Sequence, residues 1–234
     1  VYGAGILCFG SPTIAHNVIE DNDAAMTACL NGRGGGIRCI GGSPLISHNL
    51  IRNNDALFGG GICADSGASP VIVNNIIAGN DALYDSYEIG MGGFGAGIYC
   101  AGASAVITGN TIVGNISDGY GGGRGGGICG HSGSIYMANN IIAFNTDGVS
   151  SDGTVQWQMY NNNLFGNLNY DYEAGIPAGA GDISQDPAFM CRTQGDYRLV
   201  PGSLCIDAGL DTALAIPATD FGGQSRIYGD QVDI

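Results

Sequence analysis

The side chains best suited to chemistry are gathered in two short stretches of the sequence. They are Tyr84, Asp85, Tyr87 and Glu88 in the first stretch and Asp118, Tyr120 and Arg124 in the second. Tyrosine rings pack against the apolar faces of sugar rings, while carboxylates and guanidinium groups bond to the hydroxyl groups at their rims. We therefore expect these side chains to bind carbohydrate, with solvated, glycine-rich loops as the alternative.

Histidines and cysteines recur at fixed positions of a repeat. His16 and His48 occupy the same position in neighbouring copies, so their rings should stack about 4.8 Å apart, as a polar stack or as a shared metal site. Cys8, Cys39 and Cys100 each lie two residues after an isoleucine, on the same strand face. This spacing predicts buried thiols that pack as small hydrophobic groups.

Three further residues of these types depart from the pattern. Cys63 and Cys129 lie one residue earlier in their repeats, which indicates either a shifted strand register or an outward-facing side chain. His131 is expected in a turn, isolated and exposed, where a histidine carries little information about function.

The elements that must position these residues are defined by a twelve-residue motif. Its six copies begin at Ser11, Ser43, Ser69, Ser104, Ser134 and Gln156. A Gly-Ile pair precedes most copies, so each repeat offers three short strands. Repeats of this kind stack into a solenoid, because no single one can bury its apolar face. Length varies at one point of the repeat, which gathers the insertions 23–33, 81–94 and 116–124 on one edge, where binding often resides.

Within the motif, apolar residues form two columns five positions apart, as at Ile46 and Ile51. Side chains alternate along a strand, so this odd spacing requires a bend, and asparagine tolerates the left-handed backbone of a tight bend. We expect two hydrogen-bonded ladders, because buried amides need partners. They are formed by Asn17, Asn49, Asn75, Asn110, Asn140 and Asn162 and by Asn22, Asn54, Asn80, Asn115, Asn145 and Asn167.

Composition restricts the partners of the chain. Its 234 residues include 43 glycines and carry a net charge of −14, so it should repel nucleic acids and anionic membrane surfaces. No apolar run is long enough to span a membrane.

Repeat and tail together resemble a known family. The repeat is similar to that of the right-handed parallel β-helix proteins of the pectate-lyase-like superfamily. The tail has Asp-Pro-Ala-Phe at 186–189, Gly-Asp-Tyr-Arg-Leu at 195–199 and Pro-Gly-Ser-Leu-Cys-Ile-Asp-Ala-Gly at 201–209. These motifs resemble the end of bacterial extracellular members that finish with a surface-anchoring segment. The resemblance covers essentially the whole chain and implies a secreted or cell-surface location and a disulfide between Cys191 and Cys205.

The resemblance leaves the activity open, because family members include lyases, hydrolases, adhesins and proteins of no assigned role. Lyases of this type need a basic residue and Ca²⁺ held by carboxylates, so Ca²⁺ is the cofactor that such an activity would require. The only basic residues in the repeat region are Arg33, Arg38, Arg52 and Arg124. No pair of them recurs beside a cluster of aspartates, which weakens the lyase interpretation.

We expect an all-β protein, with a right-handed parallel β-helix of about six to seven rungs over 1–167 and a capping segment over 168–234. The expected function is non-catalytic: an extracellular module that binds a polysaccharide or cell-surface glycan, or that contributes to an adhesive assembly. The alternatives are a polysaccharide lyase or glycoside hydrolase acting at the loop edge, and a filament formed by end-to-end self-association. Val1 opens within a repeat, so the chain is expected to be a piece of a longer protein.

Overall fold

The structure is a computed structural model that describes residues 5–24, 32–82, 93–117, 123–227 and 229–234. Three parallel sheets wind around one apolar core, and an antiparallel pair of strands lies in the C-terminal segment. Each coil of the chain, here called a rung, pairs in parallel with the rungs before and after it. The chain therefore folds as the predicted parallel β-helix.

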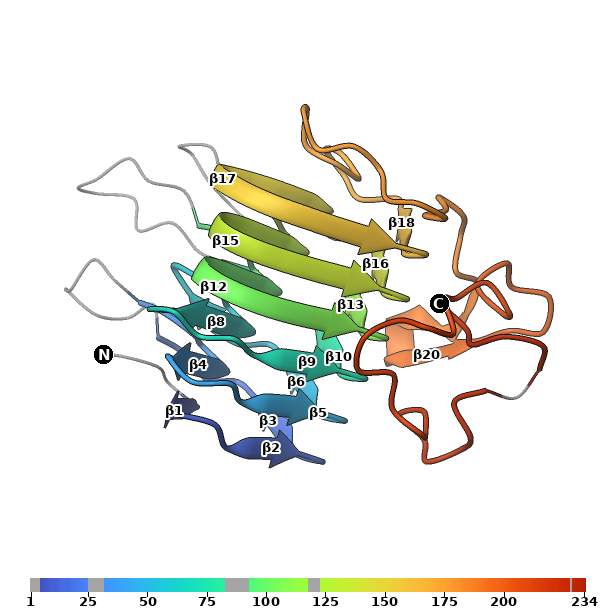
Figure 1. Cartoon of the computed structure of the whole chain (residues 1–234), viewed down its shortest axis with the longest axis horizontal. Helices are drawn as coiled ribbons and strands as arrows, with labels where there is room; N and C mark the ends of the chain where they lie inside the picture. The colour runs from blue at the N-terminus through green and yellow to red at the C-terminus, as the bar shows by residue number, and fades with distance from the viewer. Residues whose placement is uncertain (1–4, 25–31, 83–92, 118–122, 228) are drawn as a thin grey trace.

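The first sheet contains the first and second strands of the rungs. They are β1 (Ile6–Phe9), β2 (Thr13–Ala15), β4 (Ile37–Ile40), β5 (Leu45–Ser47), β8 (Ile62–Asp65), β9 (Val71–Val73), β12 (Ile98–Thr108), β15 (Ile128–Ala138) and β17 (Val149–Tyr160). The second sheet contains β3 (Val18–Glu20), β6 (Leu50–Arg52), β10 (Ile76–Ala78), β13 (Thr111–Val113), β16 (Ile141–Ala143) and β18 (Asn163–Phe165). Figure 1 shows the rungs stacked from β1 to β17 along one direction.

Two smaller groups of elements complete the described chain. The third sheet contains β7 (Asp55–Ala56), β11 (Asp81–Ala82) and β14 (Ile116–Ser117). The antiparallel pair consists of β19 (Phe189–Cys191) and β20 (Asp196–Leu199), joined by the 3₁₀ helix η1 (Arg192–Gln194).

The later rungs depart from the predicted set of three short strands. β12, β15 and β17 are 11 or 12 residues long and run through two of the expected strands. Earlier rungs have proline at the junction, as at Pro44 and Pro70, and proline cannot donate a hydrogen bond to a ladder. Ala105 and Ile135 replace it in later rungs, so the strand continues.

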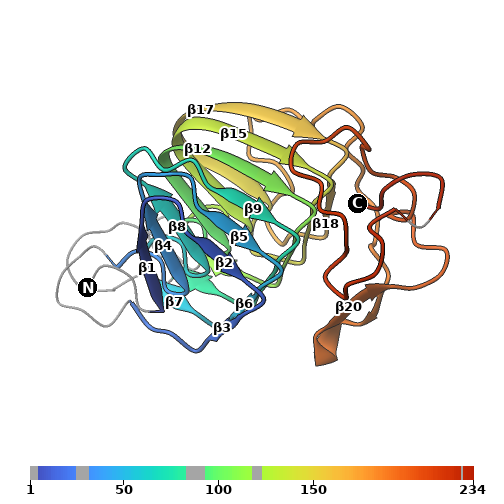
Figure 2. The ribbon, with the colours of Figure 1, turned by 60° about the horizontal axis from the view of Figure 1, so that its bottom comes forward.

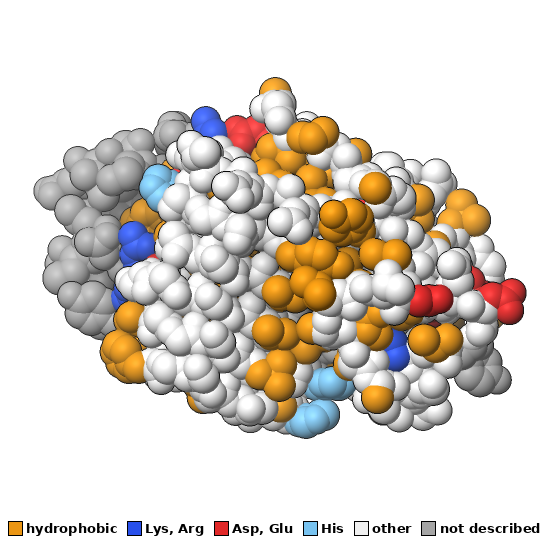
Figure 3. All heavy atoms as spheres, viewed as in Figure 1, with side chains coloured by type: hydrophobic (Ala, Val, Ile, Leu, Met, Phe, Trp, Pro, Cys, Tyr) orange, Lys and Arg blue, Asp and Glu red, His pale blue; other side chains and the backbone are white. Residues whose placement is uncertain are grey.

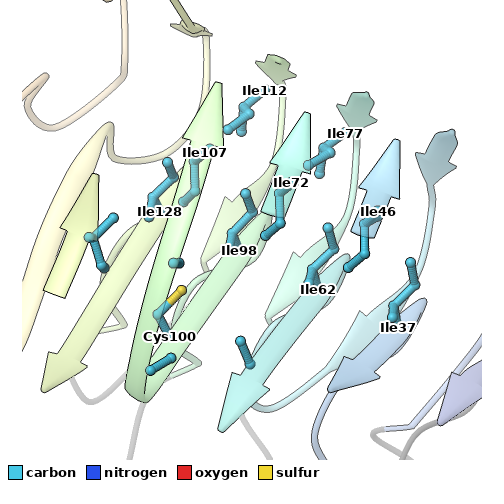
Figure 4. Packing of buried hydrophobic residues seen from close by; sticks show 14 of the residues in the cluster. Ile37, Ile46, Ile62, Ile72, Ile77, Ile98, Cys100, Ile107, Ile112 and Ile128 are labelled. Carbon is cyan, nitrogen blue, oxygen red and sulfur yellow. The ribbon is translucent and has the colours of Figure 1, made fainter. Parts of the chain in front are cut away.

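The two predicted apolar columns form the core. Ile46, Ile72 and Ile107 pair in register across the first sheet, and Ile77 pairs with Ile112 in the second. All five side chains are fully buried and point into the solenoid (Figure 4). Burying one such side chain contributes about 1.5–3 kcal/mol, so the stacked columns supply much of the stability.

Both predicted asparagine ladders form. The side-chain amide of Asn75 donates to Oδ1 of Asn110 on the next rung at 3.0 Å, and the backbone N–H of Asn75 donates to the same oxygen at 2.9 Å. The Asn75 amide also donates to the carbonyl of Ile46 at 2.9 Å. This pattern repeats along both columns, so every amide donates toward the following rung.

An aspartate ends each ladder. Asp182 accepts from the Asn162 side chain and backbone at 3.1 and 2.7 Å, and Asp171 accepts from the Asn167 side chain at 2.7 Å. A carboxylate accepts hydrogen bonds without donating any, so it can close a ladder that ends on donors. Neither ending follows from the repeat pattern, because both aspartates come after the last copy of the motif.

The left-handed residue of the first bend is not the ladder asparagine that the sequence predicts, but the residue before it. These positions have φ between 49° and 64° and form a set called here the bend column: His16, His48, Asn74, Gly109, Asn139 and Asn161. The chain reverses at the bend column, which lets the following asparagine direct its amide along the ladder. Bend-column side chains are therefore free to meet whatever packs outside the bend.

The C-terminal segment divides into two parts. Bridges from Tyr172, Ala180 and Ile183 to the last rung place residues 172–183 over its end. Later residues lie beside the solenoid instead (Figure 2).

The disulfide implied by the family resemblance is absent, because Cys191 and Cys205 are both free thiols. The Cys205 sulfur is buried against the solenoid, where it accepts from Asn163 Nδ2 at 3.2 Å. The Cys191 sulfur lies 3.7 Å from the Thr193 hydroxyl at the end of β19 instead. The two sulfurs therefore have different partners.

Candidate functional site

Outward-facing side chains of the first sheet form a register column. Arg38, Cys63, Tyr99 and Cys129 pair successively across β4, β8, β12 and β15. Cys63 and Cys129 are thus outward-facing, and their strands pair in regular register rather than in a shifted one. Both are nevertheless buried, and burial raises the pKa of each thiol to about 12. Such thiols are protonated and unreactive at neutral pH.

An aromatic cluster covers this column. The rings of Phe58 and Phe94 stack with centroids 5.7 Å apart, and Tyr99 packs against Phe58 at 5.2 Å. The guanidinium of Arg33 lies 4.6 Å from the Phe58 centroid, a cation–π contact. Phe58 and Tyr99 are 8% and 3% exposed, so the cluster is a second core at the base of the insertions rather than an open platform for sugar rings.

A buried ion pair adjoins the aromatic cluster. Arg38 donates to Asp65 Oδ2 from Nη2 at 2.7 Å and from Nε at 3.1 Å, and Arg33 Nη1 lies 3.6 Å from the same oxygen. Asp65 Oδ1 is buried and has no hydrogen-bond partner among the described residues. The ion pair joins β4 to β8.

The accessible part of this face is a polar network, called here the outer-face rim: Arg124, His131, Ser151, Asp152 and Glu173. Arg124 Nη1 donates to Glu173 Oε1 at 2.7 Å and to the Ser151 carbonyl at 2.8 Å. The Ser151 N–H donates to Glu173 Oε2 at 2.7 Å, so the carboxylate is held from two sides.

The second half of the rim centres on Asp152. His131 Nδ1 lies 2.9 Å from Asp152 Oδ1, and the Tyr99 hydroxyl donates to Oδ2 at 3.3 Å. Burial, and then the Asp152 charge, raise the pKa of Tyr99, so its hydroxyl remains a donor. The side chains of His131 and Arg124 are 52% and 43% exposed, which leaves both open to a ligand.

The expectation that His131 is isolated in a turn is wrong. It lies within β15, where register shifts separate Cys100 from Ala101 in the pairing with β12 and Gly130 from Ser132 in the pairing with β17. Such β-bulges re-aim a side chain and occur often beside functional sites. Here the irregular register brings His131 to Asp152.

Of the seven predicted ligand-binding residues, the structure describes only Arg124, which belongs to the rim. The other predictions lie outside the described residues: Tyr84, Asp85, Tyr87, Glu88, Asp118 and Tyr120. Asp152 and Glu173 were not predicted as site residues. Asp152 and Gly153 stand opposite the single residue His131 of the preceding rung, and this one extra residue is the signal that could have indicated a bulge.

A separate acidic groove of about 440 Å³ lies where the second and third sheets meet; its lining includes Asp21, Asp23, Asp55 and Asp81. Burial, and then the charges of Asp23 and Asp21, raise the pKa of Asp55. Within the described ranges, no group of three or more His, Cys, Asp or Glu side chains is placed to hold a metal ion.

The periodic residues lie where the repeat predicts. The rings of His16 and His48 stack with centroids 4.9 Å apart. Cys8, Cys39 and Cys100 are buried and point into the core.

Comparison with known proteins gives no assignment: the chain matches no known protein family, no curated protein and no solved structure. In the described part of the chain, no helix is long and apolar enough to cross a membrane.

Proposed function

We propose that this chain is an extracellular, carbohydrate-binding β-helix module of the pectate-lyase-like superfamily, and that the outer-face rim is its binding surface. The observation that carries the proposal is a pair of adjoining hydrogen-bonded groups, Arg124 with Glu173 and Ser151, and His131 with Asp152, which meet at the neighbouring residues Ser151 and Asp152. His131, Ser151 and Asp152 lie on the paired strands β15 and β17, and a rigid scaffold that presents polar groups near variable loops is typical of binding sites.

The charges of the rim favour a neutral sugar over a polyanion. Glu173 offsets the Arg124 charge, and Asp152 offsets a protonated His131. The net charge of −14 also opposes the approach of a polyanion. Vicinal hydroxyl groups both donate and accept hydrogen bonds, so they match a surface that alternates guanidinium, carboxylate and imidazole groups.

A glycan array followed by calorimetry with the strongest ligand tests the proposal. Arg124→Ala should weaken binding at least about tenfold, equivalent to about 1.4 kcal/mol, because it removes the permanent cation of the rim, whose side chain is 43% exposed. Arg52→Ala is the matched control: Arg52 has a side chain 46% exposed and pairs with Glu20 at 2.6 Å, but it lies on β6 in the second sheet. Equal losses in the two variants, or no glycan bound by the wild type, would contradict the proposal.

A second candidate function is a polysaccharide lyase or glycoside hydrolase at the same rim. Asp152 orients the His131 ring through Nδ1, which leaves the other nitrogen of an exposed ring to act as a general base. Neutral and uronic-acid polysaccharides would be assayed for unsaturated ends and for new reducing ends. His131→Gln should lower any activity at least about 100-fold. An inactive wild type in both assays would exclude this candidate.

A further inference from the structure

The C-terminal segment runs back along the solenoid, outside the first bend. Bend-column side chains hold its carbonyl groups: Asn161 donates to Ala208 at 3.0 Å and Asn139 donates to Leu210 at 3.1 Å. The Leu210 N–H donates back to Asn139 Oδ1 at 2.7 Å. Figure 3 shows hydrophobic side chains gathered where this segment meets the strands.

The segment continues toward earlier rungs. Thr108, beside the bend, donates to the Leu214 carbonyl at 2.8 Å, and Asn74 donates to the Thr219 carbonyl at 3.1 Å. Residues 208–219 therefore meet the rungs in reverse order, from the last to the third. We call residues 208–226 the strap.

Arg226 anchors the far end of the strap. Its guanidinium lies over Gly109, where an added Cβ would be 3.2 Å from Nη2, so the absence of a side chain makes room for it. Nη2 also donates to the Asp233 carbonyl at 3.2 Å. The pKa of Arg226 is lowered by burial, which indicates a largely desolvated guanidinium.

His48 is the next member of the bend column after Asn74, and it meets the same end of the strap. Both ring nitrogens are shielded from solvent and have no hydrogen-bond partner among the described residues. The charged and titratable groups facing the ring are His16 from the preceding rung and Asp220 and Arg226 from the strap. The pKa of His48 is lowered, first by burial and then by His16.

We propose that the strap is a pH-sensitive device: neutral His48 lets residues 219–226 pack on the bend, and protonation of His48 releases this end while the end at 208–210 stays attached. An imidazolium would place a charge and two N–H donors where the ring nitrogens are shielded from solvent, and the charges of Arg226 and a protonated His16 would oppose it; the Thr219 carbonyl and Asp220 offset only part of this cost. Detachment allows water to solvate the ring.

The direction of the effect follows from proton linkage. The closed form binds the proton less readily than the detached form, in which His48 has its ordinary pKa of about 6.5. The packing of residues 219–226 on the bend is therefore fully stabilised above about pH 6.5. This stabilisation is lost as the pH falls from there toward the lower pKa that His48 has in the closed form. At pH 5.5 the closed-to-open ratio should fall by up to about tenfold.

Hydrogen exchange of the whole chain at pH 7.5 and 5.5 tests the proposal, with each rate divided by its intrinsic rate at that pH. The far-end reporters are the amides of Asp220 and Arg226, which donate to the Gln224 and Ala218 carbonyls. Leu210 reports the near end. Protection at the far end should fall by up to about tenfold on acidification, with little change at Leu210.

The chain has three histidines, so each can be replaced in turn. His48→Asn should abolish the far-end pH dependence and keep the fold, because Asn74 and Asn139 occupy the same column with the same left-handed backbone. His131→Asn should leave the pH dependence intact, because His131 lies on β15 and pairs with Asp152. A far-end loss that persists in His48→Asn would overturn the proposal. So would equal loss at Leu210, or no loss in the wild type.

Discussion

Replacing Asn110 with alanine should be among the most destabilising single changes in this chain. The Asn110 side chain donates to the Ile72 carbonyl at 2.9 Å and to Asn140 Oδ1 at 3.0 Å, and its own oxygen accepts from the Asn75 backbone and amide at 2.9 and 3.0 Å. The residue is 1% exposed, so water cannot substitute for these bonds.

The loss of stability in Asn110→Ala is estimated from the hydrogen bonds that the substitution removes and the buried donor that it leaves without an acceptor. The Asn75 backbone N–H becomes a buried donor without its acceptor, at about 1–3 kcal/mol, and the bonds to Ile72 and Asn140 contribute about 1 kcal/mol each. The expected loss is about 3–5 kcal/mol, a large part of the 5–15 kcal/mol typical of a folded domain.

Asn17→Ala is the matched control, because Asn17 has the same position on the first described rung and is exposed. It donates to Asn49 Oδ1 at 3.0 Å, and its loss should cost only about 0.5–1 kcal/mol. Urea unfolding followed by circular dichroism would measure both variants. If the two free energies of unfolding differ by less than about 1 kcal/mol, the ladder does not stabilise the fold as argued.

Two further predictions concern backbone packing and thiol chemistry. Gly97→Ala should destabilise by about 2–3 kcal/mol, because the new Cβ would lie 2.5 Å from the Gly127 carbonyl oxygen. Gly114→Ala should cost only about 1–2 kcal/mol, because only its φ of +64° opposes a side chain; thermal unfolding compares the two, and an equal loss would contradict the argument. In native protein at pH 8, iodoacetamide should label Cys191 but spare Cys63, whose pKa of about 12 leaves about one thiolate in 10⁴. Peptide mass mapping would detect the adducts, and rapid labelling of Cys63 would show that its site opens.

The core and the ladders could be predicted because each requires the same type of residue at the same position of every repeat. Ile46 and Asn49 recur at fixed offsets, and burial in a stacked rung explains both. The fused strands were not predicted, although the sequence carries a signal for them, because Ala105 stands where earlier rungs have proline. The left-handed position was misassigned by one residue, since histidine and asparagine both adopt positive φ and composition does not distinguish the turning residue from the stacking one.

The candidate site was less predictable, because it depends on departures from the repeat. Arg124 was found through its place beside an insertion, whereas His131 required knowledge of register shifts that depend on three neighbouring strands. Glu173 comes from the irregular chain after the last copy of the motif, where periodicity gives no guidance. The strap was not predicted either. It also follows the last copy of the motif, and its contacts use backbone carbonyls, which no side-chain pattern reveals.

Because the asparagine ladders run in one direction, such a protein can gain or lose whole internal repeats. Every internal rung accepts ladder hydrogen bonds from one neighbour and donates the same bonds to the other. Duplication or deletion of an internal repeat therefore leaves the same hydrogen bonds between the rungs that become neighbours. The end beyond the last asparagines is different, because only an acceptor such as Asp171 or Asp182 completes it. Internal repeats are therefore interchangeable units, and the terminating segment must be kept with whichever rung comes last.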